Sequence, residues 1–365
     1  MSSPSGFFAP SRLVLARKRR GLTVVGLAQL SGVSPRSVSA YERGERSPSL
    51  RARACLADVL DFPEGFFLGE DLEEVPEPTI SFRAAVKHTA GRKNAARSAA
   101  RIGILINEWV EERVSLPDPD VPRLPGTDPE TAAQVVRISW GLGQTPVSNM
   151  IRLLERHGVR VYALPPDCAD VGSFSLYWRG VPFLFLGQAG DGAEARVEAA
   201  HELAHLVLHR GEASPASGEA ETAADEFAAH FLMPAPDLLG RTLYRAGSDR
   251  IQDVSRALKV PGMALAHRLR DMGLLQGEDY RSACANLHRF SAPAVGGETS
   301  QVLTDLLTAG QGQQVRPADI ARQLRLTREN VIGHLHGLAP ILMAGNGYPM
   351  GPPPGRPPLR MIRSS

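Results

Sequence analysis

The sequence predicts a mainly α fold with a small β-sheet, an α+β class, divided among more than one domain. Helical periodicity with capping residues recurs along the chain, for example at 23–30 and 34–41. Only two short runs are typical of strands, Arg160–Leu164 and Val181–Leu186. With 365 residues, the chain is long enough for two or three domains that each bury a core. We therefore expect separate domains with separate tasks.

The composition is that of a soluble globular protein, with 43% hydrophobic and 6% aromatic residues. The chain has no apolar run of membrane-spanning length, and Met1–Ser5 lack the charged and apolar regions of a secretory signal. We therefore expect a cytoplasmic protein without a membrane partner. Cys55, Cys168 and Cys284 are odd in number and widely spaced, which excludes a disulfide framework and a C-x-x-C metal pair.

Residues 23–41 carry the pattern of two helices joined by a short turn. Thr23 is suited to cap a helix that runs to about Leu30, and Ser31-Gly32-Val33 forms the turn. Ser34 then caps a second helix that has Pro35 in its first position. The surrounding segment 1–53 has ten Lys or Arg against two Glu, a local charge of about +8 that suits contact with phosphates.

A helix-turn-helix places its second helix in the major groove of DNA, where outward residues of the early turns reach base edges. Three residues have such positions: Arg36, Ser37 and Ser39. Three more lie where phosphates pass: Ser34, Arg43 and Arg46. The alternative is a small helical bundle whose basic face is solvated or contacts proteins.

The stretch Ser34–Ser49, with Glu42-Arg43-Gly44 followed by Pro48, resembles the end of the lambda-repressor-like, or Cro/C1-type (XRE), helix-turn-helix. This resemblance covers residues 11–68 and implies a five-helix domain that binds a double-stranded DNA operator. Because such readers usually bind two half-sites, it also implies a homodimer.

The motif His201-Glu202-Leu203-Ala204-His205 places two imidazoles one helical turn apart, where both can bind one zinc ion. Glu202 then lies beside a metal-bound water. Glu221 and Asp225 stand four residues apart on a second predicted helix, and Glu221 would complete three protein ligands with one open position. Upstream, Phe183–Leu186 is expected to form a buried or edge strand beside a peptidase cleft.

Two segments around this motif resemble the ImmA/IrrE family of metallopeptidases. The first is Ala200–Arg210 with Arg196 before it, and the second is Glu221–Pro234, which contains Phe-Ala-Ala and ends in Met-Pro. The resemblance covers about residues 145–275. Ala223 departs from the family, in which an acidic residue is frequent there, but it is expected to face away from the metal.

This resemblance implies a zincin-like metallopeptidase domain with zinc as its cofactor. The implied zinc ligands are His201, His205 and Glu221, and the implied catalytic acidic residue is Glu202. The family also implies a protein substrate, namely a helix-turn-helix repressor.

Three further residues near the motif are expected to act without binding the metal. Asp225 is expected to orient His201 or His205 through the second ring nitrogen, with a helix cap or a surface role as the alternative. His209 continues the same helix face and is expected to make a substrate or structural contact around the ligands, with a role as a ligand as the alternative. His230 lies among apolar residues and is expected to be a partly buried histidine with satisfied hydrogen bonds.

Proline-rich and glycine-rich breaks complete the predicted organisation. The parts are a helix-turn-helix domain at 1–72, a helical connector and Pro-rich linker at 73–127, a metallopeptidase domain at 128–290, a C-terminal helical module at 291–342 and a disordered tail at 343–365. For the module at 291–342, a winged helix and a dimerisation unit fit equally well.

The predicted function is that of a DNA-binding transcriptional regulator with a zinc-dependent endopeptidase domain that cleaves a repressor protein. The alternative is a DNA-binding regulator whose zinc domain is a non-catalytic sensor or structural module.

Overall fold

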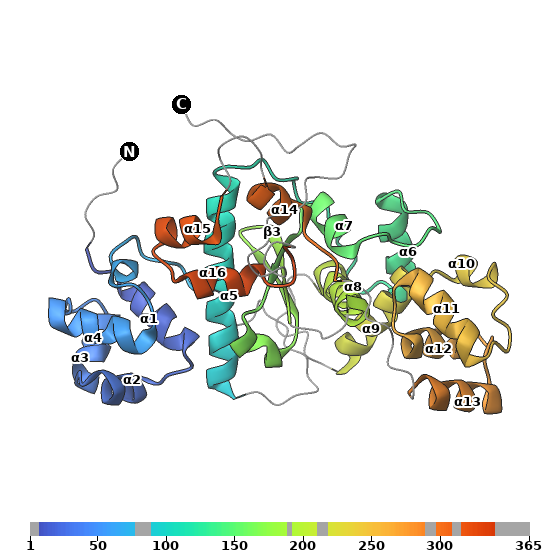
Figure 1. The fold of residues 1–365 in the computed structure, drawn as a ribbon, viewed down its shortest axis with the longest axis horizontal. Coiled ribbons are helices and arrows are strands. Elements are labelled where there is room, and N and C mark those ends of the chain that lie inside the picture. The colour runs from blue at the N-terminus through green and yellow to red at the C-terminus, as the bar shows by residue number, and fades with distance from the viewer. Residues whose placement is uncertain are drawn as a thin grey trace.

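The computed structural model describes residues 7–76, 89–187, 192–209, 218–288, 297–308 and 315–339. In these ranges the chain is mainly helical, with one three-stranded sheet near the middle of an elongated molecule (Figure 1). This agrees with the predicted class. Among these residues no helix is both long enough and apolar enough to cross a membrane.

The N-terminal helices are short, and each of three begins at a hydroxyl cap. They are α1 (Pro10–Arg19), α2 (Val24–Ser31), α3 (Pro35–Glu42) and α4 (Leu50–Leu60). The side chains of Thr23, Ser34 and Ser49 accept the first free amides of α2, α3 and α4. Gly32 ends α2 with a φ of 68°, a conformation that glycine adopts without strain. The fifth predicted helix is the 3₁₀ turn η1 (Glu64–Phe67).

The helix α5 (Ala90–Glu111) runs between the N-terminal helices and the sheet (Figure 1). It packs against α1 on one side and against the C-terminal helices on another. Its buried face includes many small residues, which let neighbours approach closely. A Cβ on Gly103 would lie 2.6 Å from Cε1 of Phe185, so only glycine fits at this crossing.

The sheet has the order β1-β3-β2, with β1 (Arg160–Ala163) parallel to β3 (Val181–Leu186) and β2 (Phe174–Trp178) antiparallel to β3. Of the two placements expected for 183–186, buried or edge, β3 therefore has the buried, central one. One edge of the sheet is β2, a strand that the sequence patterns did not predict. Arg179 and Gly180 join β2 to β3 with φ of 50° and 83°, the two left-handed residues of a tight hairpin.

Two long helices carry the metal motif. α8 (Gly192–Leu208) packs against the sheet, and α9 (Gly218–Leu232) lies beside α8. α6 (Pro129–Ser139) and α7 (Met150–Arg156) also contact α8, and η3 (Pro166–Val171) lies between β1 and β2 in the chain. The far end of the molecule is formed by α10 (Ala235–Leu239), α11 (Ser248–Leu258), α12 (Gly262–Asp271) and α13 (Gly277–Leu287) (Figure 1).

The Pro-rich part of the predicted linker, from Ser115 to Asp128, is hydrogen-bonded to the ends of α7 and α8. Its backbone amides at Asp120 and Leu124 donate to the carbonyl oxygens of His157 (3.0 Å) and Val207 (2.9 Å). Proline richness alone predicted a spacer, whereas these two hydrogen bonds hold the segment against the ends of α7 and α8.

The C-terminal helices fold back onto the centre of the molecule. They are α14 (Gln301–Thr308), α15 (Pro317–Leu324) and α16 (Arg328–Leu335), which pack on α7, on α5 and on β1 with α5, respectively. In the described ranges 297–308 and 315–339 no strand occurs, so the winged helix proposed for this segment has no wing there. The predicted disordered tail, 343–365, lies outside the described residues.

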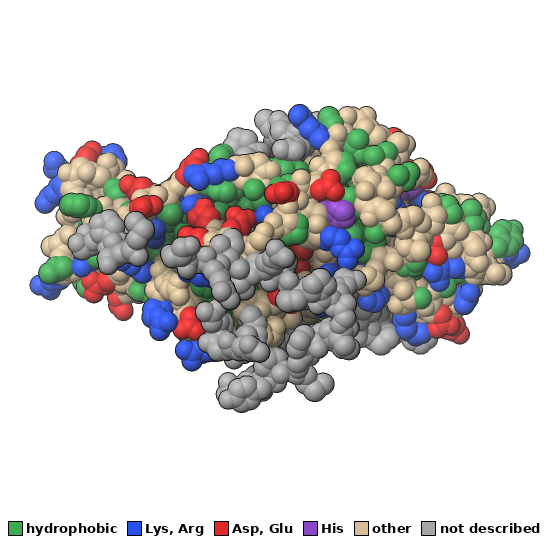
Figure 2. All heavy atoms as spheres, turned by 90° about the horizontal axis from the view of Figure 1, so that it is seen from above, with side chains coloured by type: hydrophobic (Ala, Val, Ile, Leu, Met, Phe, Trp, Pro, Cys, Tyr) green, Lys and Arg blue, Asp and Glu red, His purple; other side chains and the backbone are tan. Residues whose placement is uncertain are grey.

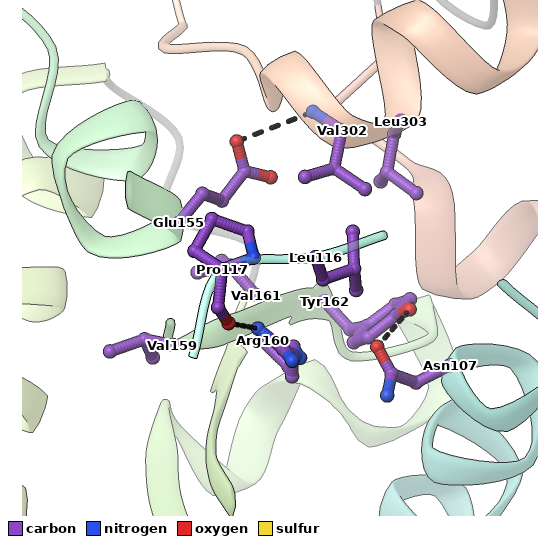
Figure 3. A pocket seen from close by; sticks show the side chains of 10 residues that line it. All are labelled: Asn107, Leu116, Pro117, Glu155, Val159, Arg160, Val161, Tyr162, Val302 and Leu303. Atoms are coloured by element: carbon purple, nitrogen blue, oxygen red, sulfur yellow. Dashed lines mark hydrogen bonds between the residues drawn. The ribbon is translucent and has the colours of Figure 1, made fainter. Parts of the chain in front are cut away.

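Reciprocal capping joins α7 to α14. The buried Glu155 of α7 accepts the amides of Gln301 (2.8 Å) and Val302 (3.4 Å), while Glu298 accepts the amides of Met150 and Ile151 at the start of α7. A cavity of about 10 Å³ lies beside Glu155 (Figure 3). Since this volume holds about one water molecule, the cavity is a packing gap and not a ligand site.

Candidate metal centre and nucleic-acid interface

The structure brings the three predicted zinc ligands together. His201 and His205 project from one face of α8, and Glu221 projects toward them from the first turn of α9. The two Nε2 atoms lie 3.1 Å apart. The carboxylate oxygens of Glu221 lie 3.6 Å from Nε2 of His201 and 3.5 Å from Nε2 of His205.

This arrangement suits a metal better than it suits hydrogen bonding. Oε1 of Glu221 is buried and has no hydrogen-bond partner among the described residues. Two nitrogens that each lie about 2.0–2.1 Å from a tetrahedral zinc are about 3.3 Å apart, close to the separation seen here. Two imidazoles, one carboxylate and an orphaned buried oxygen therefore fit a zinc ion.

Asp225 and His209 contact the outer nitrogens of the two histidines. Oδ1 of Asp225 lies 2.7 Å from Nδ1 of His201, and Nδ1 of His209 lies 3.1 Å from Nδ1 of His205. Each contact leaves the histidine's Nε2 directed at the ligand cluster. A carboxylate on Nδ1 fixes the tautomer whose Nε2 lone pair is free for a metal, as expected for Asp225.

Burial on its own lowers the pKa of His201, but its hydrogen bonds to Asp225 and Glu221 and the charge of Glu202 raise it to about 9. A metal that binds His201 must therefore displace a proton from the ring.

Glu202 lies between the two histidines in sequence and is only 4% exposed. Burial raises the pKa of its carboxyl group to about 7, against the lowering effect of the His201 charge and of a hydrogen bond from Ser175. The hydroxyl of Ser175 donates to Oε2 of Glu202 over 2.8 Å. Sequence reasoning missed Ser175 because it missed β2; the Arg179-Gly180 hairpin signal would have found that strand.

Buried polar contacts anchor both helices. Arg196 of α8 forms an ion pair with Glu298 and also donates to the carbonyl oxygen of Val147. On α9, the ring nitrogens of His230 each lie 3.1 Å from a guanidinium nitrogen of Arg268, and Nδ1 also lies 3.4 Å from Oε1 of Glu130. Because arginine only donates and one ring nitrogen carries a hydrogen, at most one of the two nitrogens accepts from Arg268.

The predicted DNA-contacting residues all lie on α3, at its cap or in the turn after it. Ser34 is occupied as the cap of α3, accepting the amide of Ser37 over 3.1 Å and donating to its hydroxyl over 2.9 Å. Arg36 and Arg46 are exposed, and Ser39 is partly exposed. Nε and Nη2 of Arg43 donate to Glu45 over 2.6 and 2.9 Å, so a phosphate contact through either nitrogen requires that hydrogen bond to break.

Most of the N-terminal positive charge is already engaged in contacts. Seven of the ten basic residues in 1–53 form ion pairs or hydrogen bonds: Arg12, Arg17, Lys18, Arg19, Arg20, Arg43 and Arg53. With the residues that the structure describes, Arg36, Arg46 and Arg51 form neither. Arg51, on α4, was missed by sequence reasoning.

The local charge of about +8 therefore overstates how much positive charge is free on the surface of the N-terminal helices. Figure 2 shows Lys and Arg side chains at the left-hand end of the molecule, where α2–α4 lie, interspersed with acidic and apolar ones.

Two known families match separate parts of the chain. A family described as "Helix-turn-helix" matches residues 13–66, and one described as "IrrE N-terminal-like domain" matches residues 154–270. No curated protein matches the chain. The second match includes α8, α9 and all three candidate ligands. The chain therefore combines a Cro/C1-type (XRE) helix-turn-helix domain with an IrrE/ImmA-like peptidase domain.

Proposed function

We propose that this protein is a transcriptional regulator that binds an operator through α3 and cleaves a repressor protein with a zinc-dependent endopeptidase site. The observation that carries the peptidase half is the convergence of His201, His205 and Glu221, with the buried Glu202 beside them. Two half-sites per operator make a homodimer the proposed DNA-binding form.

When bound, zinc would polarise the scissile carbonyl group and lower the pKa of a water molecule. Glu202 accepts a proton from that water as the carbon–oxygen bond forms. It then returns the proton to the amine that leaves as the carbon–nitrogen bond breaks. Asp225 keeps His201 in the tautomer that binds metal, and the burial of the site strengthens these interactions.

The cleavage test uses zinc-loaded protein with the helix-turn-helix repressors of its own cell and with unfolded casein as a general substrate. We expect discrete fragments from the wild type and none from Glu202→Gln, which keeps the size of the side chain but removes the base. Equal fragments from both proteins, or none from either at full zinc loading, would contradict a peptidase.

One observation favours the alternative of a non-catalytic zinc sensor. Arg19 of the helix-turn-helix domain pairs with Asp167 of η3 at 2.7 Å, a contact that joins this domain to the part of the chain that carries the candidate metal centre. Operator affinity of Glu202→Gln with and without zinc separates the two. The sensor is supported if zinc changes the operator affinity equally in the wild type and in Glu202→Gln, and if the wild type cleaves no protein.

A further inference from the structure

The segment 173–177 meets α8 at three evenly spaced points. The hydroxyls of Ser173, Ser175 and Tyr177 donate to Glu198, Glu202 and Leu206 of α8, respectively. Residues two apart on a strand rise about 6.7 Å, and residues four apart on a helix rise about 6 Å. The two periods match closely enough for alternate strand residues to contact successive helical turns.

Among these three contacts, only that of Ser175 reaches the carboxylate that the proposed function uses as a base. Its hydroxyl lies 2.8 Å from Oε2 and 3.1 Å from the backbone oxygen of Glu202, and its residue is 5% exposed. With the described residues, Oε1 of Glu202 forms no hydrogen bond. The two carboxylate oxygens are thus differently engaged.

We propose that Ser175 is a positioning residue, which holds Oε2 of Glu202 so that Oε1 remains available to take the proton from the attacking water. A glutamate side chain has several rotatable bonds, and ordering it within the site costs conformational entropy. Because the hydrogen bond from the Ser175 hydroxyl orders the Glu202 side chain in the folded protein, this entropy is already lost before the substrate binds. This inference rests on the proposed function, because it assigns Glu202 the role of base.

The neighbouring contacts provide matched controls. Tyr177→Phe removes the hydroxyl that donates to the Leu206 carbonyl over 3.2 Å and leaves Glu202 untouched. Ser173→Ala removes the contact with Glu198, one turn before Glu202. If Ser175 only joined β2 to α8, all three substitutions would have similar effects.

The test measures the affinity of zinc-loaded protein for acetohydroxamate, a small zinc chelator that can hydrogen-bond a neighbouring carboxylate and needs no peptide specificity. We expect Ser175→Ala to weaken binding about three- to ten-fold, the effect of one lost hydrogen bond. Tyr177→Phe and Ser173→Ala should leave it unchanged. In a Glu202→Gln background, Ser175→Ala should have a much smaller effect.

Zinc content and the unfolding midpoint of each variant show whether the site is intact. Should Ser175→Ala fail to fold or to hold zinc, Ser175→Cys keeps a side chain of similar shape with a weaker donor and should still lower the affinity. An equal loss in the three alanine or phenylalanine variants, or the same loss with and without Glu202, would overturn the proposal. If the acetohydroxamate affinities change as expected but the wild type does not cleave casein, the result would instead reject the peptidase function alone.

Discussion

At the scale of residues, the sequence predicted those whose chemistry demands a fixed spacing on one element. Two imidazoles four residues apart share a helix face wherever that helix lies, so the spacing alone was enough to pair His201 with His205. Ser175 and Arg51 carry no such signature. Ser175 depends on the register of β2 against α8. Arg51 is set apart from most basic residues of 1–53 only by having no partner among the described residues, which the sequence does not show.

The unpaired arginines lead to a prediction about DNA. Arg46→Ala and Arg51→Ala should each weaken binding to all sequences and lower the salt dependence by about one counterion, because each removes one phosphate contact. Arg36→Ala should instead relax preference at one operator position, at a cost of roughly 1–3 kcal/mol. Titrations of operator and scrambled DNA at several salt concentrations measure both effects. Unchanged DNA binding in all three variants would contradict the proposal that α3 lies in the major groove.

At the scale of elements, local signals predicted the N-terminal helices well and the sheet poorly. Hydroxyl caps at Thr23 and Ser34 and the turn at Gly32 fixed the boundaries of α2 and α3. β2 was missed, although its turn contains the diagnostic glycine, Gly180. The ties of 115–128 to α7 and α8 depend on contacts between distant parts of the chain, which periodicity does not report.

The reciprocal caps between α7 and α14 give a pH-dependent stability. Burial raises the pKa of Glu155 to about 7, against hydrogen bonds from Ser300, Gln301 and Val302 that lower it. Because the pKa in the folded chain is above that in the unfolded chain, the contribution of Glu155 is full below about pH 4.5 and is lost as pH rises through about 7.

Glu155→Gln does not titrate and keeps an oxygen that accepts the amide of Gln301. The variant should therefore gain stability relative to wild type as pH rises from about 4.5 to about 7. Urea unfolding of both proteins at several pH values measures this difference. A difference in the free energy of unfolding that is constant across that range would show that Glu155 does not titrate there.

At the scale of the whole molecule, the helix-turn-helix domain packs on the rest of the chain through several separate contacts. α1 packs along α5, Arg19 pairs with Asp167, and Arg325 before α16 donates to the carbonyl oxygens of Gly65 (3.1 Å) and Leu68. The sequence predicted separate domains but not these contacts between them, because each contact joins residues far apart in the chain.

Breaking the Arg19–Asp167 pair should loosen this packing. Arg19 is 3% exposed, so Asp167→Ala leaves a buried cation without its carboxylate, which destabilises the folded chain. Because Asp167 itself is about half exposed, solvent screens the ion pair and the loss of stability is smaller than for a fully buried pair. We expect a destabilisation of about 1–3 kcal/mol and faster amide hydrogen exchange in α1 and η3. Asp61→Ala, which breaks the more exposed pair with Arg20 within the helix-turn-helix domain, is the control and should leave η3 unaffected.

The most direct test of the metal centre is the amount of zinc bound per chain, measured by native mass spectrometry on the purified full-length protein. Wild type should hold about one zinc, and Glu221→Ala should lose it, because two imidazoles alone bind zinc weakly. Glu219→Ala removes an exposed carboxylate from the same first turn of α9 and should keep full zinc. Full zinc in Glu221→Ala would contradict the site that carries the proposed function. So would a loss of zinc that is equally large in Glu221→Ala and in Glu219→Ala.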